Sequence, residues 1–460
     1  MKKRVLFAIA LLAASMLYFS TAVPVFAQNG PRGSLRAGAA KVDITPAEDE
    51  LPETSQGILD HIFVRAIVFS NGSKKGAFLT VDSAGAGGYD EIARWAESNL
   101  DIPYGNILFS ATHTHSSARI PREKMTAALQ EALTKAHDNM QPAKLGYGES
   151  VSYINVSRDI FDQDRRTWWE GPNYDGMSDK TVAVIVFETL DGKPFACYAN
   201  YAVHAVVTGN TDMVSGDIPG ATSSYVESGY GDDFVACWAS GAAGDQNPVY
   251  FQQTFDLRDI RIKDYAERGE DISNRMPPGG QGLDRTKPEV QRLLNEQKMM
   301  IQSMGQMLGE AIRYAIEGIR RFETEITINS GFKTVSVPGR RNTNMQGRAG
   351  YQGVWEDAED VQIGLALLMI DDIPVTAVNG EVYNKIAVRL KRESPYSRTM
   401  MTTVASVPGV SARGFGAGYI PDDESFGNET FEVLSGRYKP GYAESAIVNG
   451  LLDLIHEATH

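Results

Sequence analysis

The stretch from Ala77 to Ser110 is the part of the sequence that most constrains the fold. It begins with an apolar run, Ala77–Val81, that is typical of a buried β-strand. A glycine-rich loop leads to a helical pattern near Tyr89–Asn99, and a second strand pattern follows at Asn106–Ser110. A strand, a helix and a strand in this order are typical of two parallel strands joined by a crossover helix. The stretch therefore predicts an α/β fold.

The rest of the chain extends this pattern without a repeat or a clear linker. We expect one domain over residues 37–460, with a large mixed β-sheet core flanked by helices. Strand patterns occupy 37–44, 62–69, 182–189, 195–203, 234–239, 324–337, 362–370 and 374–378, and helix patterns occupy 122–139, 223–230, 288–321 and 443–457. Two stretches lack periodicity. Residues 146–179 are rich in aromatics and typical of a binding loop, and the charged residues 250–287 indicate a surface excursion.

The first 27 residues have the pattern of a signal peptide. Lys2, Lys3 and Arg4 precede a mostly apolar run, and small residues favour cleavage after Ala27. Residues 28–36 are polar, contain Gly and Pro, and are predicted to be flexible. No later apolar run reaches the roughly 18 residues that a membrane-spanning helix needs. We therefore expect an exported protein, periplasmic or secreted.

The charge of the chain limits its partners. Loss of the three positive charges of the signal peptide would move the formal net charge from −14 to −17. An acidic surface repels phosphate backbones, so we expect no nucleic-acid partner. We expect a small-molecule or lipid substrate instead, and at most a transient contact with a membrane surface. The sequence does not indicate an oligomeric state.

The sequence contains two cysteines, Cys197 and Cys237, each within an apolar run. Export would permit a disulfide between them. Cysteine in an apolar run often behaves as a small buried hydrophobe, which favours two free thiols.

His113 and His115 lie two residues apart just after the strand pattern Asn106–Ser110. On an extended backbone such residues point to the same side, so both imidazoles can converge on one point. Neutral imidazole is a common metal ligand. The alternative is that the two side chains only form hydrogen bonds within a loop.

Polar residues of the kind that catalysis uses also follow other strand patterns. Asp82, His204, the loop with Asp245 and Asn247, and Glu381 each stand at such a position. Because ligands of α/β sheets bind beyond the carboxyl ends of the strands, these residues can share one crevice. With seven histidines in the chain, a site for one metal fits better than a site for two. Asp245 and Asn247 are equally compatible with building a turn.

Several motifs resemble those of the neutral/alkaline non-lysosomal ceramidase family, in the same order along the chain. They are Asp43-Ile-Thr-Pro46, Ala111-Thr-His-Thr-His-Ser116, Asn200-Tyr-Ala-Val-His204, Ser215-Gly-Asp-Ile-Pro-Gly220, Gly244-Asp-Gln-Asn-Pro248, Asn379-Gly-Glu381 and Gly418-Tyr-Ile-Pro421. The resemblance implies a ceramidase-like catalytic domain with one zinc ion per chain.

The resemblance also implies roles for individual residues. The metal ligands would be His113, His204, Glu381 and Tyr419, His115 would face the substrate carbonyl, and Arg158 would belong to the site. The chain departs from the family at Asn247, where the family has a catalytic serine, and at His115-Ser-Ser-Ala118, where the family has His-Ser-Gly-Pro. It also ends without room for the C-terminal immunoglobulin-like domain of that family.

From these residues we predict a zinc-dependent hydrolase of amide bonds, or of an ester or lactone, in which zinc-bound water attacks the carbonyl. Asp245 or Asp82 would orient a ligand histidine, and Asn247 would donate its amide to the substrate. One alternative is a true ceramidase, with Trp168, Trp169 and Phe415 lining an apolar groove. The other is a non-catalytic relative that binds zinc or a ligand.

Overall fold

The computed structural model describes residues 31–53, 55–209, 211–272, 283–410 and 416–459. The predicted signal peptide, residues 1–27, lies outside the described residues. Of the segment 28–36, predicted to be flexible, residues 31–36 are described, and Gly33–Ser34 form strand β1, which pairs with β14 (Glu325–Ile326). Among the helices described, none combines the length and the apolar character that crossing a membrane requires.

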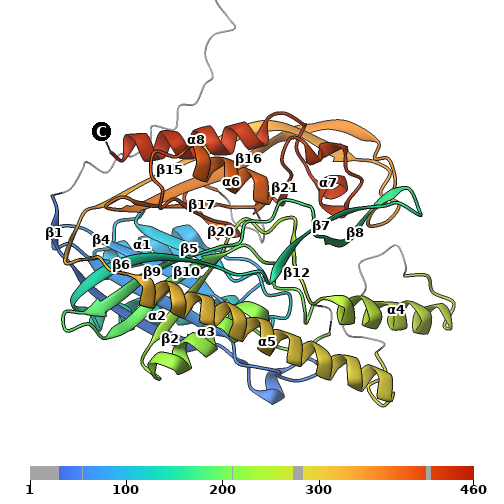
Figure 1. Ribbon diagram of the computed structural model, residues 1–460, viewed down its shortest axis with the longest axis horizontal. Coiled ribbons are helices and arrows are strands. Elements are labelled where there is room, and N and C mark those ends of the chain that lie inside the picture. The colour runs from blue at the N-terminus through green and yellow to red at the C-terminus, as the bar shows by residue number, and fades with distance from the viewer. Residues whose placement is uncertain (1–30, 54, 210, 273–282, 411–415, 460) are drawn as a thin grey trace, which may run out of the picture.

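A mixed ten-stranded sheet forms the centre of the molecule (Figure 1). Its order is β11-β10-β9-β6-β2-β3-β4-β5-β20, with β13 paired to β6. The strands are β2 (Arg36–Asp43), β3 (Phe63–Ser70), β4 (Lys75–Val81), β5 (Ile107–Ala111), β6 (Gln141–Val151), β9 (Thr181–Thr189), β10 (Pro194–Tyr201), β11 (Val235–Ser240), β13 (Phe322–Glu323) and β20 (Ala405–Ser406). The pair β4–β5 is parallel, as the strand-helix-strand pattern predicted, and the pair β10–β11 is parallel as well.

Four helices cover one face of this sheet. Helices α1 (Tyr89–Leu100) and α2 (Arg122–Asp138) pack on the side chains of β3 and β4. Helices α3 (Asp217–Tyr230) and α5 (Pro288–Gly318) pack on β9, β10 and β11. Alternation along β3 explains this division, because Val64 and Ala66 point to the helices and Ile67 and Phe69 point away.

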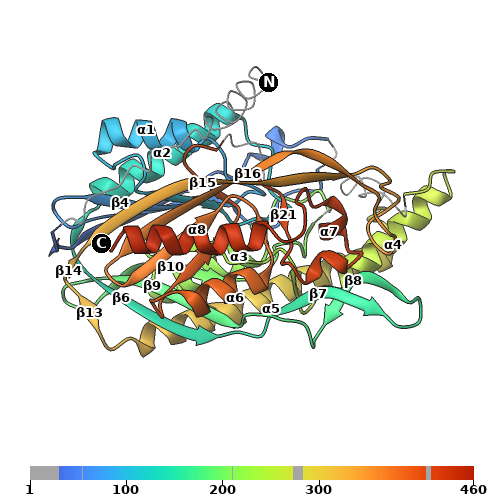
Figure 2. The ribbon, with the colours of Figure 1, turned by 90° about the horizontal axis from the view of Figure 1, so that it is seen from above.

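A second sheet covers the opposite face, a layer that the sequence did not reveal. It has the order β15-β16-β17-β19, and its strands are β15 (Ile328–Asn342), β16 (Trp355–Ile370), β17 (Ile373–Val378) and β19 (Met400–Thr402). Helices α6 (Asn384–Glu393) and α8 (Ala443–Glu457) close its outer side. Figures 1 and 2 show the resulting four layers, with two sheets between two layers of helices.

Two stretches differ from their prediction. Residues 146–179 hold the end of β6 and a hairpin of β7 (Asn155–Asp162) and β8 (Thr167–Asn173), and β7 also pairs with β12 (Gln246–Pro248). The stretch 250–287 includes helix α4 (Gln252–Ala266). Only Leu257 and Arg261 of α4 are buried, so the helix has no apolar stripe to reveal it. The short elements are β18 (Glu381–Val382), β21 (Tyr419–Ile420), α7 (Phe431–Ser435) and the 3₁₀ turns Glu48–Glu50 and Ser425–Gly427.

The cysteines confirm the prediction of free thiols. Cys197 lies on β10 and Cys237 on the neighbouring β11, and both are buried and unpaired with each other. Burial raises the pKa of both thiols, which keeps them protonated.

Candidate metal centre

Three buried side chains converge beyond the carboxyl ends of separate strands. His113 follows β5, His204 follows β10, and Glu381 begins β18. The Nε2 atoms of the two histidines are 3.0 Å apart. Glu381 Oε2 lies 3.2 Å from Nε2 of His113 and 3.5 Å from Nε2 of His204. The structure therefore brings together His113, His204 and Glu381, three of the residues expected to share one crevice.

The chemistry of this triangle fits a cation. Nδ1 of His113 lies 2.7 Å from the carbonyl oxygen of Ala84, and Nδ1 of His204 lies 2.9 Å from that of Ala243. When each Nδ1 donates to its carbonyl, each Nε2 presents a lone pair. Two lone pairs and a carboxylate then face one another. Ligand atoms at 2.0–2.1 Å from a tetrahedral zinc ion would be about 3.3 Å apart, close to the three distances here.

The charge states of His204 and Glu381 are those that metal binding requires. Burial lowers the pKa of His204 well below its ordinary value, so the imidazole is neutral. Burial acts to raise the pKa of Glu381, but the side chains around it, His113 first and then Arg158 and His115, outweigh burial, and the pKa of Glu381 ends below its ordinary value. A neutral imidazole and an ionised carboxylate are the forms that bind metals.

His115 also lies close to this triangle, but the backbone that places it there differs from the predicted one. The backbone of His113 is left-handed, with φ of 66°, so the segment is not extended as expected. The turn still brings Nε2 of His115 to 3.4 Å from Nε2 of His113. The nitrogens of His113, His115 and His204 all lie within 4.8 Å of one another, so His115 is also within reach of an ion at this point.

The His115 side chain stands at the edge of the site. It is exposed, and it lines a cavity of about 280 Å³ with Ser116 and Met213. The other side of its ring packs against His113 and His204, at 4.9 and 5.4 Å between centroids. Loss of hydration on that side, and then the neighbouring His113, lower the pKa of His115 to about 3. The lowered pKa leaves the His115 imidazole neutral at pH 7.

Polar contacts fix the turn that carries His113 and His115. Thr114 Oγ1 donates to the carbonyl of Ser215 at 2.7 Å, and Ser116 Oγ donates to the carbonyl of Thr208 at 2.7 Å. Thr208 in turn donates its amide and hydroxyl to Asp217 Oδ2, at 2.8 and 2.7 Å. The motif Ser215–Gly220 thus supports the histidine turn. Sequence reasoning missed Thr208, because no local pattern marks it.

Asp60 binds the segment Ser215–Gly216 and predicts that the stability of the protein depends on pH. Its carboxylate accepts from Ser215 Oγ at 2.6 Å and from the Gly216 amide at 2.7 Å. Burial outweighs these bonds and raises the pKa of Asp60 from 3.8 to about 6. The folded state therefore favours protonated Asp60. The free energy of unfolding should fall as the pH rises from about 4 to 6, because Asp60 ionises more easily in the unfolded chain. This fall amounts to at most about 3 kcal/mol.

Chemical unfolding at pH 4, 5, 6 and 7 measures this step. In Asp60→Asn the loss of stability between pH 4 and 6 should shrink relative to the wild type, because asparagine does not ionise. If the free energy of unfolding falls by the same amount in the wild type and in Asp60→Asn, Asp60 is not the source of the pH dependence. Asp43→Asn is a suitable control, since the pKa of that exposed residue is lowered instead.

Arg158 and Tyr419 lie beside the triangle. Arg158 is buried, donates to the carbonyl of Gly244 at 2.6 Å, and forms an ion pair with Glu432 at 2.7 Å. Its guanidinium lies 5.5 Å from the centroid of the Tyr419 ring. Tyr419 lies opposite Glu381 in the β18–β21 pair, and its ring stacks on that of His204 at 6.5 Å. The role of Tyr419 as fourth ligand stays a prediction.

The two aspartates expected to orient a ligand histidine make other contacts. Asp245 Oδ1 accepts from the backbone amide of Asn384, at the start of α6. Asp82 accepts from Arg65 at 3.0 Å and from the amide of Phe63. The partners of the histidine Nδ1 atoms are the carbonyls of Ala84 and Ala243. Asp245 thus lies at a helix N-terminus, where its carboxylate accepts a hydrogen bond from a backbone amide that has no partner within the helix.

Asn247 is held at both ends of its amide. Its Oδ1 accepts from Arg158 at 3.3 Å, and its Nδ2 donates to Glu170 Oε1 at 3.1 Å. Glu170 also forms an ion pair with Arg348 at 2.8 Å. The sequence did not reveal Glu170, Arg348 or Glu432. Trp168 and Trp169 are half-buried on β8, and Phe415 lies outside the described residues.

Comparison with known proteins places these features in a family. Residues 38–317 match the model of the family described as neutral/alkaline non-lysosomal ceramidase, N-terminal. Neutral ceramidase B of Dictyostelium discoideum is 28% identical over 260 residues, which are 47% of this chain and 36% of that protein. Neutral ceramidase of Drosophila melanogaster is 27% identical over 256 residues, 46% of this chain and 36% of that protein. The matched part thus spans about a third of these curated relatives.

Solved structures support the fold. The crystal structure of neutral ceramidase from Pseudomonas aeruginosa has a TM-score of 0.63 and covers 92% of this chain and 74% of its own, at 15% identity. A structure described as ceramidase complexed with C2 gives the same TM-score and coverage, at 14% identity. At this identity the likeness establishes the architecture, and the chemistry has to be argued from the site.

Proposed function

Because the chain belongs to the neutral/alkaline non-lysosomal ceramidase family, we propose that it is a metal-dependent hydrolase of amide bonds. One observation carries the proposal. His113, His204 and Glu381 present three acceptor atoms within 3.0–3.5 Å of one another, beside a cavity lined by His115. Two histidines and one glutamate, with a position left open, are a known ligand set of catalytic zinc.

In this proposal His113, His204 and Glu381 hold one zinc ion, Tyr419 is a fourth protein ligand, and a fifth position would take water or the substrate carbonyl. When bound, zinc supplies a Lewis acid that polarises a carbonyl and makes water a better nucleophile at neutral pH. The carbonyls of Ala84 and Ala243 fix both imidazoles with Nε2 facing inward. Neutral His115, at the cavity edge, is placed to hydrogen-bond the substrate carbonyl as charge develops on its oxygen.

Water is the proposed nucleophile. Asn247 stands where the related sequences have a serine, and its amide is already bonded to Arg158 and Glu170. The nearby hydroxyls of Ser116 and Ser240 donate to the carbonyls of Thr208 and Thr112. In the reaction the water oxygen joins the acyl carbon, the C–N bond breaks, and the leaving amine takes up a proton.

The cavity at His115 is the proposed site of the acyl part. Its wall includes Leu51, Pro52, Met213 and Val214. It shares Pro46, Glu50 and Arg119 with a neighbouring cavity of about 540 Å³. Cavities of ~300–1,000 Å³ hold drug-sized ligands, so the two together offer room for an acyl chain.

A hydrolase screen with and without a chelator tests the function. The zinc-loaded protein should release amine from short N-acyl amides, lose this activity with dipicolinate, and regain it when zinc is added back. A fluorescent ceramide in the same screen shows whether that lipid is also a substrate. Activity that survives removal of the metal, or an acyl group trapped covalently on Ser116 or Ser240, would contradict the proposed chemistry.

A further inference from the structure

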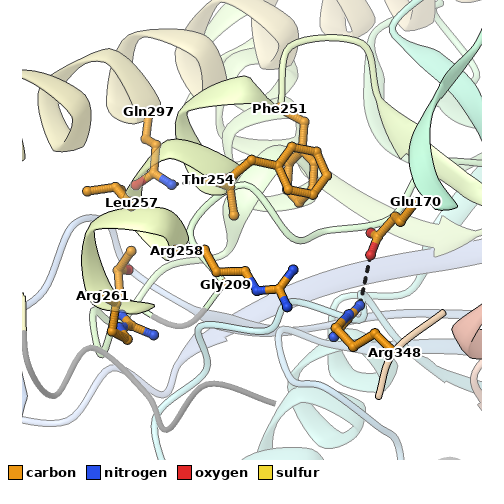
Figure 3. A pocket seen from close by; sticks show the side chains of 11 residues that line it. Glu170, Gly209, Phe251, Thr254, Leu257, Arg258, Arg261, Gln297 and Arg348 are labelled. Carbon is orange, nitrogen blue, oxygen red and sulfur yellow. Dashed lines mark hydrogen bonds and ion pairs between the residues drawn. The ribbon is translucent and has the colours of Figure 1, made fainter. Parts of the chain in front are cut away.

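A further cavity, of about 70 Å³, is lined by residues of several separate segments (Figure 3). Helix α4 contributes Arg258 and Arg261, the β7–β8 hairpin contributes Glu170, and Arg348 comes from the segment between β15 and β16. The remaining wall combines the apolar Phe251, Phe255 and Leu257 with the polar Thr211, Thr254 and Gln297. We call this cavity the basic pocket. No role was expected for any of these arginines from the sequence.

The charges of the basic pocket favour an anion. Three arginines face one carboxylate, Glu170, which already forms an ion pair with Arg348 at 2.8 Å. In Figure 3 the guanidinium of Arg258 points toward this pair. Burial lowers the pKa of Arg258, and the charge of Arg348 lowers it further, while Glu170 and Asp259 act in the opposite sense. An anion between these guanidinium groups would relieve both effects.

Arg261 reinforces the positive charge. Burial lowers its pKa as well, and Asp212 is the main acid that opposes this. Asp212 also lies near Arg285, so its charge is divided between two cations. The lining of the basic pocket itself thus carries three guanidinium groups and one carboxylate, although the protein as a whole has a formal net charge of −14.

Two of the residues that line the basic pocket lie close to residues beside the candidate metal centre. Gly209 lines the pocket, and a Cβ atom built at Gly209 would lie 3.6 Å from Cβ of His115. Glu170, on another wall, accepts the hydrogen bond of Asn247. The pocket thus adjoins both His115 and Asn247.

The volume of the pocket limits what enters it. About 70 Å³ is well below the ~300–1,000 Å³ of sites for drug-sized ligands and suits one small charged group rather than an alkyl chain. The larger cavity on the other side of His115 takes the acyl part in the proposed function. The basic pocket is left for the group that the amide nitrogen carries.

We propose that the basic pocket binds a carboxylate or a phosphate on the amine part of the substrate. The substrate is then an acidic amide, such as an N-acyl amino acid, rather than a neutral one. This inference rests on the proposed amide hydrolysis. Arg258 and Arg348 would bind the oxygens of the anion, and Glu170 would hold Arg348 in place.

Three substrates with one acyl group test this inference on the zinc-loaded protein. N-hexanoylglycine carries a carboxylate, N-hexanoylphosphoethanolamine carries a phosphate, and N-hexanoylethanolamine is neutral. We expect a higher kcat/KM for one of the two anions than for the neutral amide. In Arg258→Gln the ratio of anionic to neutral kcat/KM should fall about 10- to 100-fold, the loss of one charge-assisted hydrogen bond.

Lys263→Gln is the matched control, because Lys263 is an exposed cation on the same helix that does not line the pocket. Its ratio should equal that of the wild type. Comparing two substrates on one preparation removes any effect of misfolded protein, and Arg261→Gln replaces Arg258→Gln if the latter does not fold. An unchanged ratio in the pocket variant, or a neutral substrate used as well as both anions, would overturn the inference.

A binding measurement separates this inference from the proposed function. If none of the three amides is hydrolysed, the function fails, and the pocket is then tested by calorimetry with N-hexanoylglycine and inorganic phosphate. Binding to the wild type that weakens at least about 10-fold in Arg258→Gln supports the pocket. Equal affinity in both proteins, or no binding to either, rejects it.

Discussion

His113→Ala and His204→Ala are expected to purify without bound zinc and without amidase activity. Each substitution removes one of three acceptor atoms that lie 3.0–3.5 Å apart. Loss of a direct ligand should weaken zinc binding by more than the 10- to 100-fold that losing an outer partner costs. Metal analysis of the dialysed proteins measures this directly, and kcat/KM on the best amide should fall in parallel.

His137→Ala is the matched control for both variants. His137 lies on α2, with its Nε2 3.0 Å from Lys75 Nζ and away from the triangle. Its removal should leave zinc content and kcat/KM at the wild-type level. Wild-type zinc content in both His113→Ala and His204→Ala would show that the metal, if any is bound, lies elsewhere.

Arg158→Met is expected to destabilise the protein by about 3–5 kcal/mol, the usual cost of removing one partner of a buried ion pair. Arg158 and Glu432 are both buried and 2.7 Å apart. Burial raises the pKa of Glu432 and of the nearby Asp159, and without the guanidinium both lose the main cation that opposes this rise. Methionine keeps much of the side-chain volume, so the loss reports charge rather than a cavity.

Urea unfolding at pH 7 measures this effect. Arg165→Met serves as the control, because Arg165 is an exposed arginine between β7 and β8. It should change the free energy of unfolding by less than about 0.5 kcal/mol. A similarly small change in Arg158→Met would mean that Glu432 is neutral or well solvated, and the described charge network would then be wrong.

The sequence predicted much of the fold because its strands are short, apolar and bounded by turns. Helix α8 has the predicted bounds, Ala443–Glu457, since its apolar residues recur with helical spacing. Helix α4 was missed, because its buried face is so small that no periodicity shows. The packing of the second sheet on the first was also missed, because which sheet a strand joins depends on contacts far apart in sequence.

The convergence of His113, His204 and Glu381 could be predicted from one rule, that polar residues at the carboxyl ends of strands meet at one edge of a sheet. The details could not. The left-handed backbone of His113 is set by the turn between Ala111 and Ser116, and the sequence pattern favoured an extended one. Glu170 and Arg348 meet Asn247 from two other elements, and no local motif marks them.

The most direct test of the central claim is an anomalous difference map from a crystal of the zinc-loaded protein, recorded at the zinc absorption edge. We predict one strong peak between His113 Nε2, His204 Nε2 and Glu381 Oε2, at about 2.0–2.2 Å from each. A map without a peak at this point, or with its main peak at another group of residues, would contradict the assignment of the metal centre.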